Sequence, residues 1–146
     1  MSGTHPTSDA PSRQGVAEVL HAHGITPTQQ RVDIAAILLE CPQHLSAEQV
    51  LSRVNAAGGS VSKATVYNTL GLFADRGLVR EVIVDPSRVF YDSNTRPHHH
   101  LYEVTTGRLE DIDPAVVSVA SLPALPPGTV VEAVEVVVRV RQPAGE

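Results

Sequence analysis

Residues 58–70 read GGSVSKATVYNTL, and this stretch decides the fold. Its two glycines stop the apolar pattern before them, and the second serine can cap a helix that starts at the next residue. Val66, Leu70 and Phe73 recur at helical spacing and are expected to pack inward. Polar side chains, Thr69 among them, are expected on the outer side, where such groups reach bases and phosphates of DNA. The stretch therefore predicts the second helix of a helix-turn-helix motif.

Two helices are expected near the start of the chain. An apolar pattern over residues 16–20 predicts a short helix that Gly24 ends. Thr26, as the cap, and Pro27, in the first turn, begin a second helix that ends near Cys41.

A third helix and a wing complete this region. Ser46 begins the third helix, and Gln49 completes a capping box with it. After the stretch quoted first, residues 78–84 and 88–91 read as a two-stranded hairpin separated by Asp85-Pro86-Ser87. Such a hairpin is typical of the wing of a winged helix.

Six polar residues are candidates for contact with DNA. Lys63 and the helix N-terminus would hold phosphates, the other helix residues would reach base edges or thymine methyls, and the residue near the wing tip would touch the backbone. The alternative is a four-helix scaffold whose polar face is merely solvated. The candidates are Ser62, Lys63, Thr65, Tyr67, Asn68 and Arg88.

A second informative stretch, DSNTRPHHH at residues 92–100, gathers metal ligands, and Asp111 follows eleven positions after its last histidine. If a hairpin turns at residues 106–107, Tyr102 pairs with Asp111. Side chains alternate along a strand, so Asp111 projects on the face shared by His98 and His100, and the middle histidine points away.

The predicted site is built from nitrogen and oxygen alone. Imidazoles and carboxylates suit Fe(II), Mn(II) or Zn(II). The alternatives are a solvated strand start and a remnant of a purification tag, which the internal position and the spaced carboxylates disfavour. The metal-ligand candidates are His44, Asp92, His98, His100 and Asp111.

The single cysteine, Cys41, limits the chemistry further. One cysteine can form neither a four-cysteine zinc site nor an internal disulfide, which fits a reducing cytoplasm. A lone cysteine at a helix end is expected to be a small buried hydrophobe, although Cys41-Pro42 resembles a haem-regulatory dipeptide.

Composition excludes several classes of protein. A chain of 146 residues with 42% hydrophobic content can form one compact domain or two small ones. Its net charge of -5 argues against a general nucleic-acid coating protein but not against a sequence reader. Nothing resembles a membrane span, and residues 1–14 read as a disordered tail rather than a signal peptide. A cytoplasmic location is expected.

The C-terminal part predicts a dimerisation surface. Residues 129–141 read as one long Val-rich strand, after a connector at 123–127 and a short helix over 114–121. Such a strand is an aggregation hazard in a monomer, and pairing with a second copy removes that hazard. The alternative is that the strand packs wholly inside its own domain.

Several motifs together resemble the ferric uptake regulator (Fur) family over about residues 14–141. A further string, FYDSNT at 90–95, followed by the histidine triplet without a Cys-x-x-Cys, is most similar to the iron response regulator branch, which senses haem, as is VVVRVR at 136–141. The family motifs are ITPTQQR at 25–31, HLSAE at 44–48, KATVYNTL at 63–70, GLV at 77–79 and the triplet at 98–100.

The resemblance implies an α+β regulator that acts as a homodimer on palindromic double-stranded operators. The implied parts are a disordered tail at 1–14, a winged helix-turn-helix domain at 15–92, a hinge at 93–97, an α/β dimerisation and sensing domain at 98–141, and a tail at 142–146.

By position, the five metal-ligand candidates fall on the family's regulatory metal site, and Thr65 and Tyr67 fall on its DNA-contacting positions. The triplet His98, His99 and His100 matches the stretch implicated in haem binding. The implied regulator binds DNA when haem is scarce and releases it when haem is abundant.

One departure and two alternatives remain. Where most relatives carry the first Cys-x-x-Cys, this chain has EVTT at 103–106, so no four-cysteine structural zinc is expected. A peroxide sensor of the same family would use the same five ligands with Fe(II). A non-haem metal enzyme could use two histidines and a carboxylate, but the sequence offers no nucleophile or cofactor loop.

Overall fold

The computed structural model describes residues 10–85 and 87–143, and the chain divides into two compact units between Thr95 and Arg96. That division lies inside the segment 93–97 that the sequence assigns to a hinge. Most of the expected N-terminal tail, residues 1–9, lies outside the described part. No helix among the described residues is both long and apolar enough to cross a membrane.

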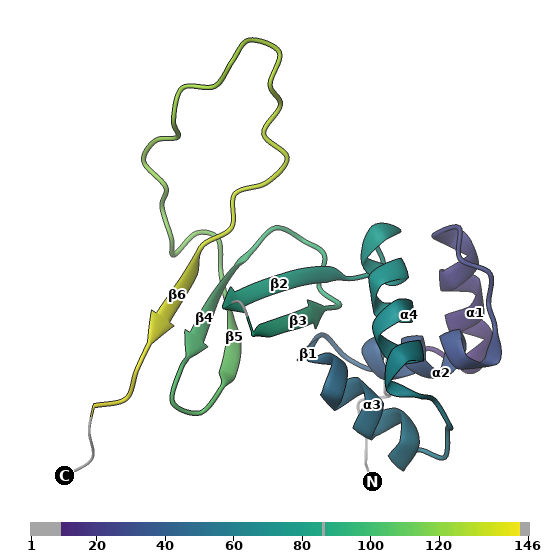
Figure 1. The fold of residues 1–146 in the computed structure, drawn as a ribbon. Helices are drawn as coiled ribbons and strands as arrows, with labels where there is room; N and C mark the ends of the chain where they lie inside the picture. The colour runs from purple at the N-terminus through teal and green to yellow at the C-terminus, as the bar shows by residue number, and fades with distance from the viewer. Residues whose placement is uncertain (1–9, 86, 144–146) are drawn as a thin grey trace, which may run out of the picture. The chain divides into compact units, whose positions relative to one another are not determined.

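Four helices and a small sheet form the first unit (Figure 1). The sheet is antiparallel, with strand order β1-β3-β2. The helices are α1 (Arg13–Ala22), α2 (Gln29–Leu38), α3 (Ala47–Ala56) and α4 (Lys63–Asp75), and the strands are β1 (His44–Leu45), β2 (Arg80–Asp85) and β3 (Arg88–Asp92).

Each helix begins where a hydroxyl satisfies a backbone N–H of its first turn. Ser46 and Gln49 form the expected capping box of α3, and Ser62 caps α4. The prediction that Thr26 caps α2 is wrong, because Thr28 accepts from the N–H of Arg31 and the helix starts after it. The expected tail over residues 1–14 is also too long, since α1 begins at Arg13.

The core of the first unit lies between the helices. Val66, Leu70 and Phe73 of α4 are fully buried, as the spacing predicts. Thr69 was expected on the outer side but is buried, at 7% exposure. The turn before α4 needs glycine at position 59, because a Cβ there would lie 2.8 Å from the side chain of Val54.

Three strands form the second unit, in the order β5-β4-β6. Strands β4 and β5 are antiparallel, whereas β4 and β6 are parallel. Their bounds are β4 (His99–Glu103), β5 (Arg108–Ile112) and β6 (Val137–Val140).

The expected register of the β4–β5 hairpin is wrong by two residues. His100, not Tyr102, pairs with Asp111, because the turn spans residues 104–107 rather than two residues. Gly107 adopts a φ of 78°, and the Glu103 carboxylate accepts backbone N–H groups within the turn. A shift of two residues leaves every side chain on its expected face.

Two C-terminal expectations are also wrong. Residues 114–121 form no helix, and the long strand expected over 129–141 is reduced to β6. Prolines and β-branched residues disfavour a helix there, and only four residues find a strand partner in β4. The segment between β5 and β6 is drawn as one long loop (Figure 1). It carries exposed apolar side chains, with Val116 at 75% and Val130 at 85% exposure.

Candidate metal centre and nucleic-acid interface

The first unit contributes one histidine and one aspartate that face each other. His44 of β1 and Asp92 of β3 are directly paired in the sheet. The Nε2 atom of His44 lies 3.5 Å from Oδ2 of Asp92, whose side chain is fully buried. The other carboxylate oxygen accepts the N–H of Asn94 at 2.8 Å. The pairing of β1 with β3 and the hydrogen bond from Asn94 to Asp92 therefore fix the positions of the His44 and Asp92 side chains.

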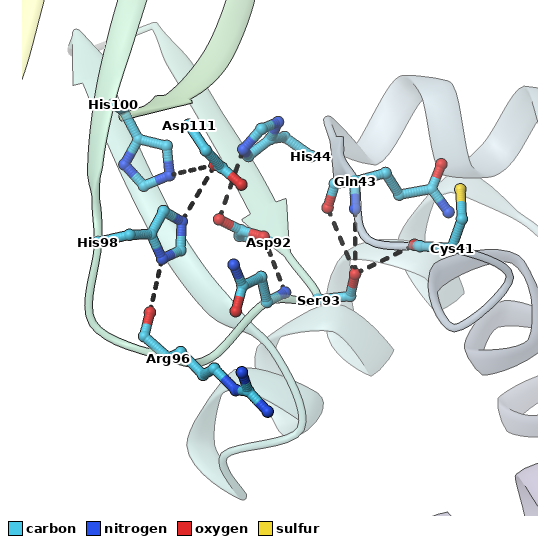
Figure 2. A network of polar contacts seen from close by, with 10 residues as sticks. Cys41, Gln43, His44, Asp92, Ser93, Arg96, His98, His100 and Asp111 are labelled. Carbon is cyan, nitrogen blue, oxygen red and sulfur yellow. Dashed lines mark hydrogen bonds and ion pairs between the residues drawn. The ribbon is translucent and has the colours of Figure 1, made fainter. Parts of the chain in front are cut away.

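Hydrogen bonds around Gln43 and Ser93 hold this pair of strands together (Figure 2). The Ser93 N–H donates to the Gln43 carbonyl oxygen at 3.2 Å, and the Gln43 N–H donates to the Ser93 hydroxyl. The Gln43 amide donates to the carbonyl oxygen of Ile37 and accepts from Arg53 of α3 at 2.9 Å. Ser93 also donates to the carbonyl of Cys41, whose side chain is exposed, contrary to expectation.

Gln43, Arg53 and Ser93 are not among the candidate metal ligands, and no sequence pattern pointed to them. Only their position beside His44 and Asp92 could have pointed to them. They connect the pair to α2 and α3.

The second unit contributes two histidines and an aspartate. Figure 2 shows the rings of His98 and His100 directed at Asp111. Oδ1 of Asp111 lies 3.1 Å from Nε2 of His98 and 3.6 Å from Nε2 of His100. The hairpin face predicted from the sequence is thus the observed one, with Asp111 directly opposite His100.

Backbone groups orient the rings of His98 and His99. Nδ1 of His98 is hydrogen bonded to the carbonyl oxygen of Arg96. A carbonyl only accepts, so Nδ1 carries the proton and the Nε2 lone pair is available to a metal. His99 points elsewhere, and its Nδ1 accepts the N–H of Val136 at 3.0 Å. It therefore lies outside the trio formed by His98, His100 and Asp111.

The trio suits a small divalent ion. One donor atom from each residue lies within 4.8 Å of the other two. Donors that share an ion at about 2.0–2.2 Å lie at most about 4.4 Å apart, so small side-chain adjustments suffice. Nitrogen and carboxylate oxygen donors fit Fe(II), Mn(II) and Zn(II). The two histidines are almost fully buried, whereas Asp111 is 41% exposed and stays open to an entering ion.

The candidate DNA-contacting residues lie at the surface of the first unit. Ser62, Lys63, Tyr67 and Asn68 are exposed at α4, and Arg88 is exposed on the wing. Thr65 is half-buried.

Internal hydrogen bonds already engage several of these side chains. The Ser62 hydroxyl accepts the Thr65 N–H and donates to the Thr65 hydroxyl, so both serve the helix cap. Tyr67 donates to the carboxylate of Glu48, and no sequence pattern had placed Glu48 on this surface.

The family model that describes the ferric uptake regulator family matches residues 22–122. The chain belongs to this family. The peroxide-responsive repressor PerR of Staphylococcus epidermidis is 29% identical over 111 residues, which cover 76% of this chain and 73% of that protein. PerR of Staphylococcus aureus is 32% identical over 92 residues, or 63% of this chain and 62% of that protein.

Solved structures of the family share the fold. The ferric uptake regulator of Pseudomonas aeruginosa, solved with manganese, has a TM-score of 0.67 at 27% identity, over 86% of this chain and 96% of that one. Mixed helix and sheet, with an N-terminal helix-turn-helix, is the architecture that the sequence predicts. Members of the family are transcription regulators, so the chain is a Fur-family regulator and not an enzyme.

Proposed function

We propose that the chain is a homodimeric transcription repressor whose affinity for a palindromic operator is controlled by one Fe(II) or Mn(II) ion. The proposed ligands are His44, Asp92, His98, His100 and Asp111. The observation that carries the proposal is that each unit holds a preset part of this donor set: the paired His44 and Asp92, and the trio on β4 and β5.

The chain itself keeps the two sets of donors within reach of each other. Asp92 and His98 are six residues apart, a span of at most about 20 Å even when fully extended. An ion that takes ligands from both units favours the arrangement in which both donor sets meet. Such an ion changes DNA affinity only through its differential binding to that arrangement. Two backbone groups orient the ligands: the Arg96 carbonyl orients the ring of His98, and the Asn94 N–H holds the carboxylate of Asp92.

We infer that the signal is the metal ion itself, which the donor geometry supports, together with peroxide, which the relatives suggest. The PerR relatives are peroxide-responsive by name. Bound Fe(II) would supply reactivity toward peroxide, and the imidazoles that hold it would be the groups at risk. Oxidation of buried His98 or His100 would remove an imidazole donor from the trio.

Haem is a second candidate signal, and one observation favours it. A pocket of about 290 Å³ adjoins His99 and is lined by Val117, Val119, Leu122 and Val134. An apolar pocket suits a porphyrin edge, and His99 could bind the iron axially once the hydrogen bond from the Val136 N–H to its Nδ1 atom is given up. The same proposal places the protein in the cytoplasm, because the operator DNA and the reducing conditions that keep iron as Fe(II) are found there.

The test is an operator-binding titration at fixed, stated salt. Mn(II), haemin, and Fe(II) followed by peroxide are added separately, and peptide masses after proteolysis are measured following the peroxide step. We expect Mn(II) to support binding, and Fe(II) with peroxide to abolish it with a gain of oxygen on His44 or His98. Mn(II)-supported binding that haemin reverses, with no peroxide effect, would instead establish the haem response. The His99→Ala variant, which keeps all five proposed metal ligands, then tests whether the haem binds at the pocket beside His99.

A further inference from the structure

Three exposed side chains meet on the DNA-contacting side of the first unit. The Tyr67 hydroxyl donates to Oε2 of Glu48 at 2.9 Å. Nζ of Lys63 lies 3.8 Å from the same oxygen and 5.9 Å from the centre of the Tyr67 ring. A carboxylate among candidate phosphate contacts repels DNA, so its presence there calls for a role that outweighs the repulsion.

The hydrogen bond determines what Tyr67 can offer to DNA. A phenol has one proton and two acceptor lone pairs, and a carboxylate only accepts. With its proton directed to Glu48, the Tyr67 oxygen is left as an acceptor. Phosphate oxygens are acceptors too and cannot bind it in that state. The donors of the major groove are the exocyclic amino groups of adenine and cytosine.

We propose that Glu48 is a specificity-determining residue, which holds Tyr67 as a hydrogen-bond acceptor for an exocyclic amino group of the operator and draws Lys63 away from nonspecific phosphate contact. The inference rests on the proposed function, because it needs a specific operator. Glu48 acts through Tyr67 and Lys63 and is therefore a positioning residue.

The protonation of the pair favours this arrangement. The hydrogen bond from Tyr67 is the largest cause that lowers the pKa of Glu48, and the same bond is the largest cause that raises the pKa of Tyr67. Both shifts keep the carboxylate charged and the phenol protonated at neutral pH. An exposed ion pair such as Lys63 with Glu48 contributes little to stability, so its effect is expected on DNA binding rather than on folding.

The experiment compares specific and nonspecific affinity in the full chain with Mn(II). The unmodified chain first selects an operator from a random duplex pool. Fluorescence anisotropy at fixed salt then gives Kd for that operator and for an unrelated duplex of equal length. The variants are Glu48→Ala, Glu48→Gln, Tyr67→Phe and the double variant with Glu48→Ala and Tyr67→Phe. Glu40→Ala, which removes an exposed carboxylate just beyond α2, is the matched charge control.

Glu48→Ala is expected to tighten nonspecific binding and to lower the ratio of specific to nonspecific affinity about five- to tenfold. Glu48→Gln should keep most of the ratio, because its amide oxygen still accepts the Tyr67 proton. In the Tyr67→Phe background, Glu48→Ala should lower the ratio no further. Replacing one operator adenine by purine, or one cytosine by a pyrimidine without the amino group, should weaken the unmodified chain and not Tyr67→Phe.

Four results would overturn the inference, the last of them together with the proposed function. Equal ratios for Glu48→Ala and Glu40→Ala would show that only charge matters. An unchanged effect of Glu48→Ala in the Tyr67→Phe background would show that Tyr67 is not the intermediary. If the unmodified chain binds its operator and no Glu48 variant alters the ratio, this inference alone fails. If no operator can be selected at all, the proposed function fails and takes the inference with it.

Discussion

The two units of this chain bury different kinds of side chain. In the first unit most of the fully buried residues are aliphatic or aromatic, such as Leu70 and Phe73, and the candidate ligand Asp92 is the charged exception among the described residues. In the second unit the buried residues among those described are Tyr102 and three histidines, while valines such as Val130 remain exposed. Hydrophobic burial can stabilise the first unit alone. The second unit is built around buried histidines, and its valines remain exposed to solvent.

Truncating the core of the first unit gives the largest expected effect. Phe73→Ala removes a fully buried ring and should cost about 3–5 kcal/mol of unfolding free energy, measured by urea denaturation. Val130→Ala, at a position that is 85% exposed, is the control and should change stability by less than about 0.5 kcal/mol. Similar costs for both variants would contradict the contrast between the units.

Removing a ligand from the second unit should chiefly affect metal binding. His100→Ala takes away one imidazole of the trio and should weaken Mn(II) binding by at least about 100-fold, measured by calorimetry. Operator binding should then no longer respond to Mn(II). His21→Ala, which changes an exposed histidine of α1, is the control. Unchanged Mn(II) affinity in His100→Ala would remove this residue from the site.

The same contrast explains what could be predicted from sequence. The first unit follows local rules, because caps, helical spacing and glycine turns are encoded within a few residues of where they act. The expected α4, wing and capping box are all observed. Thr69 was wrongly predicted to be exposed, because its hydroxyl group makes it polar although its small side chain fits into a core.

The second unit was predicted less well, for a physical reason. Its hairpin register was wrong by two residues, yet Asp111 still faces His98 and His100, since side-chain direction depends only on odd or even spacing. The segment from 113 to 136 was expected to form a helix and part of a strand, because its valines suit either in isolation. Whether such residues form a strand depends on a partner elsewhere, which local sequence does not encode.

The exposed valines give the next prediction. If a second copy covers this surface, Val138→Asp places a charge where an apolar contact forms and should weaken dimerisation at least about tenfold, measured by sedimentation equilibrium. Ile83→Asp, on the wing of the first unit and 62% exposed, is the matched control and should leave the dimer intact. If both variants dissociated equally, or if neither dissociated, the dimer interface would lie elsewhere.

The smallest effect is expected at the turn of residues 104–107, between β4 and β5. The Glu103 carboxylate accepts the N–H groups of Thr105 and Thr106, at 2.8 and 3.2 Å. Burial alone would raise its pKa, but these hydrogen bonds together lower it. A carboxylate with a lowered pKa in the folded state stabilises the fold above its unfolded pKa, and that contribution is lost as the pH falls through the folded value.

Glu103→Gln should therefore lower the urea midpoint slightly at neutral pH, and its difference from the unmodified chain should vanish in acid below the ordinary range of a glutamate pKa. Glu110→Gln, on the neighbouring strand, is the control. A chelator should leave the second unit folded, because hydrogen bonds to the Glu103 carboxylate hold this turn without a metal. If chelation unfolded the chain, the second unit would need a metal for its fold, and the turn at Glu103 would be insufficient to hold it.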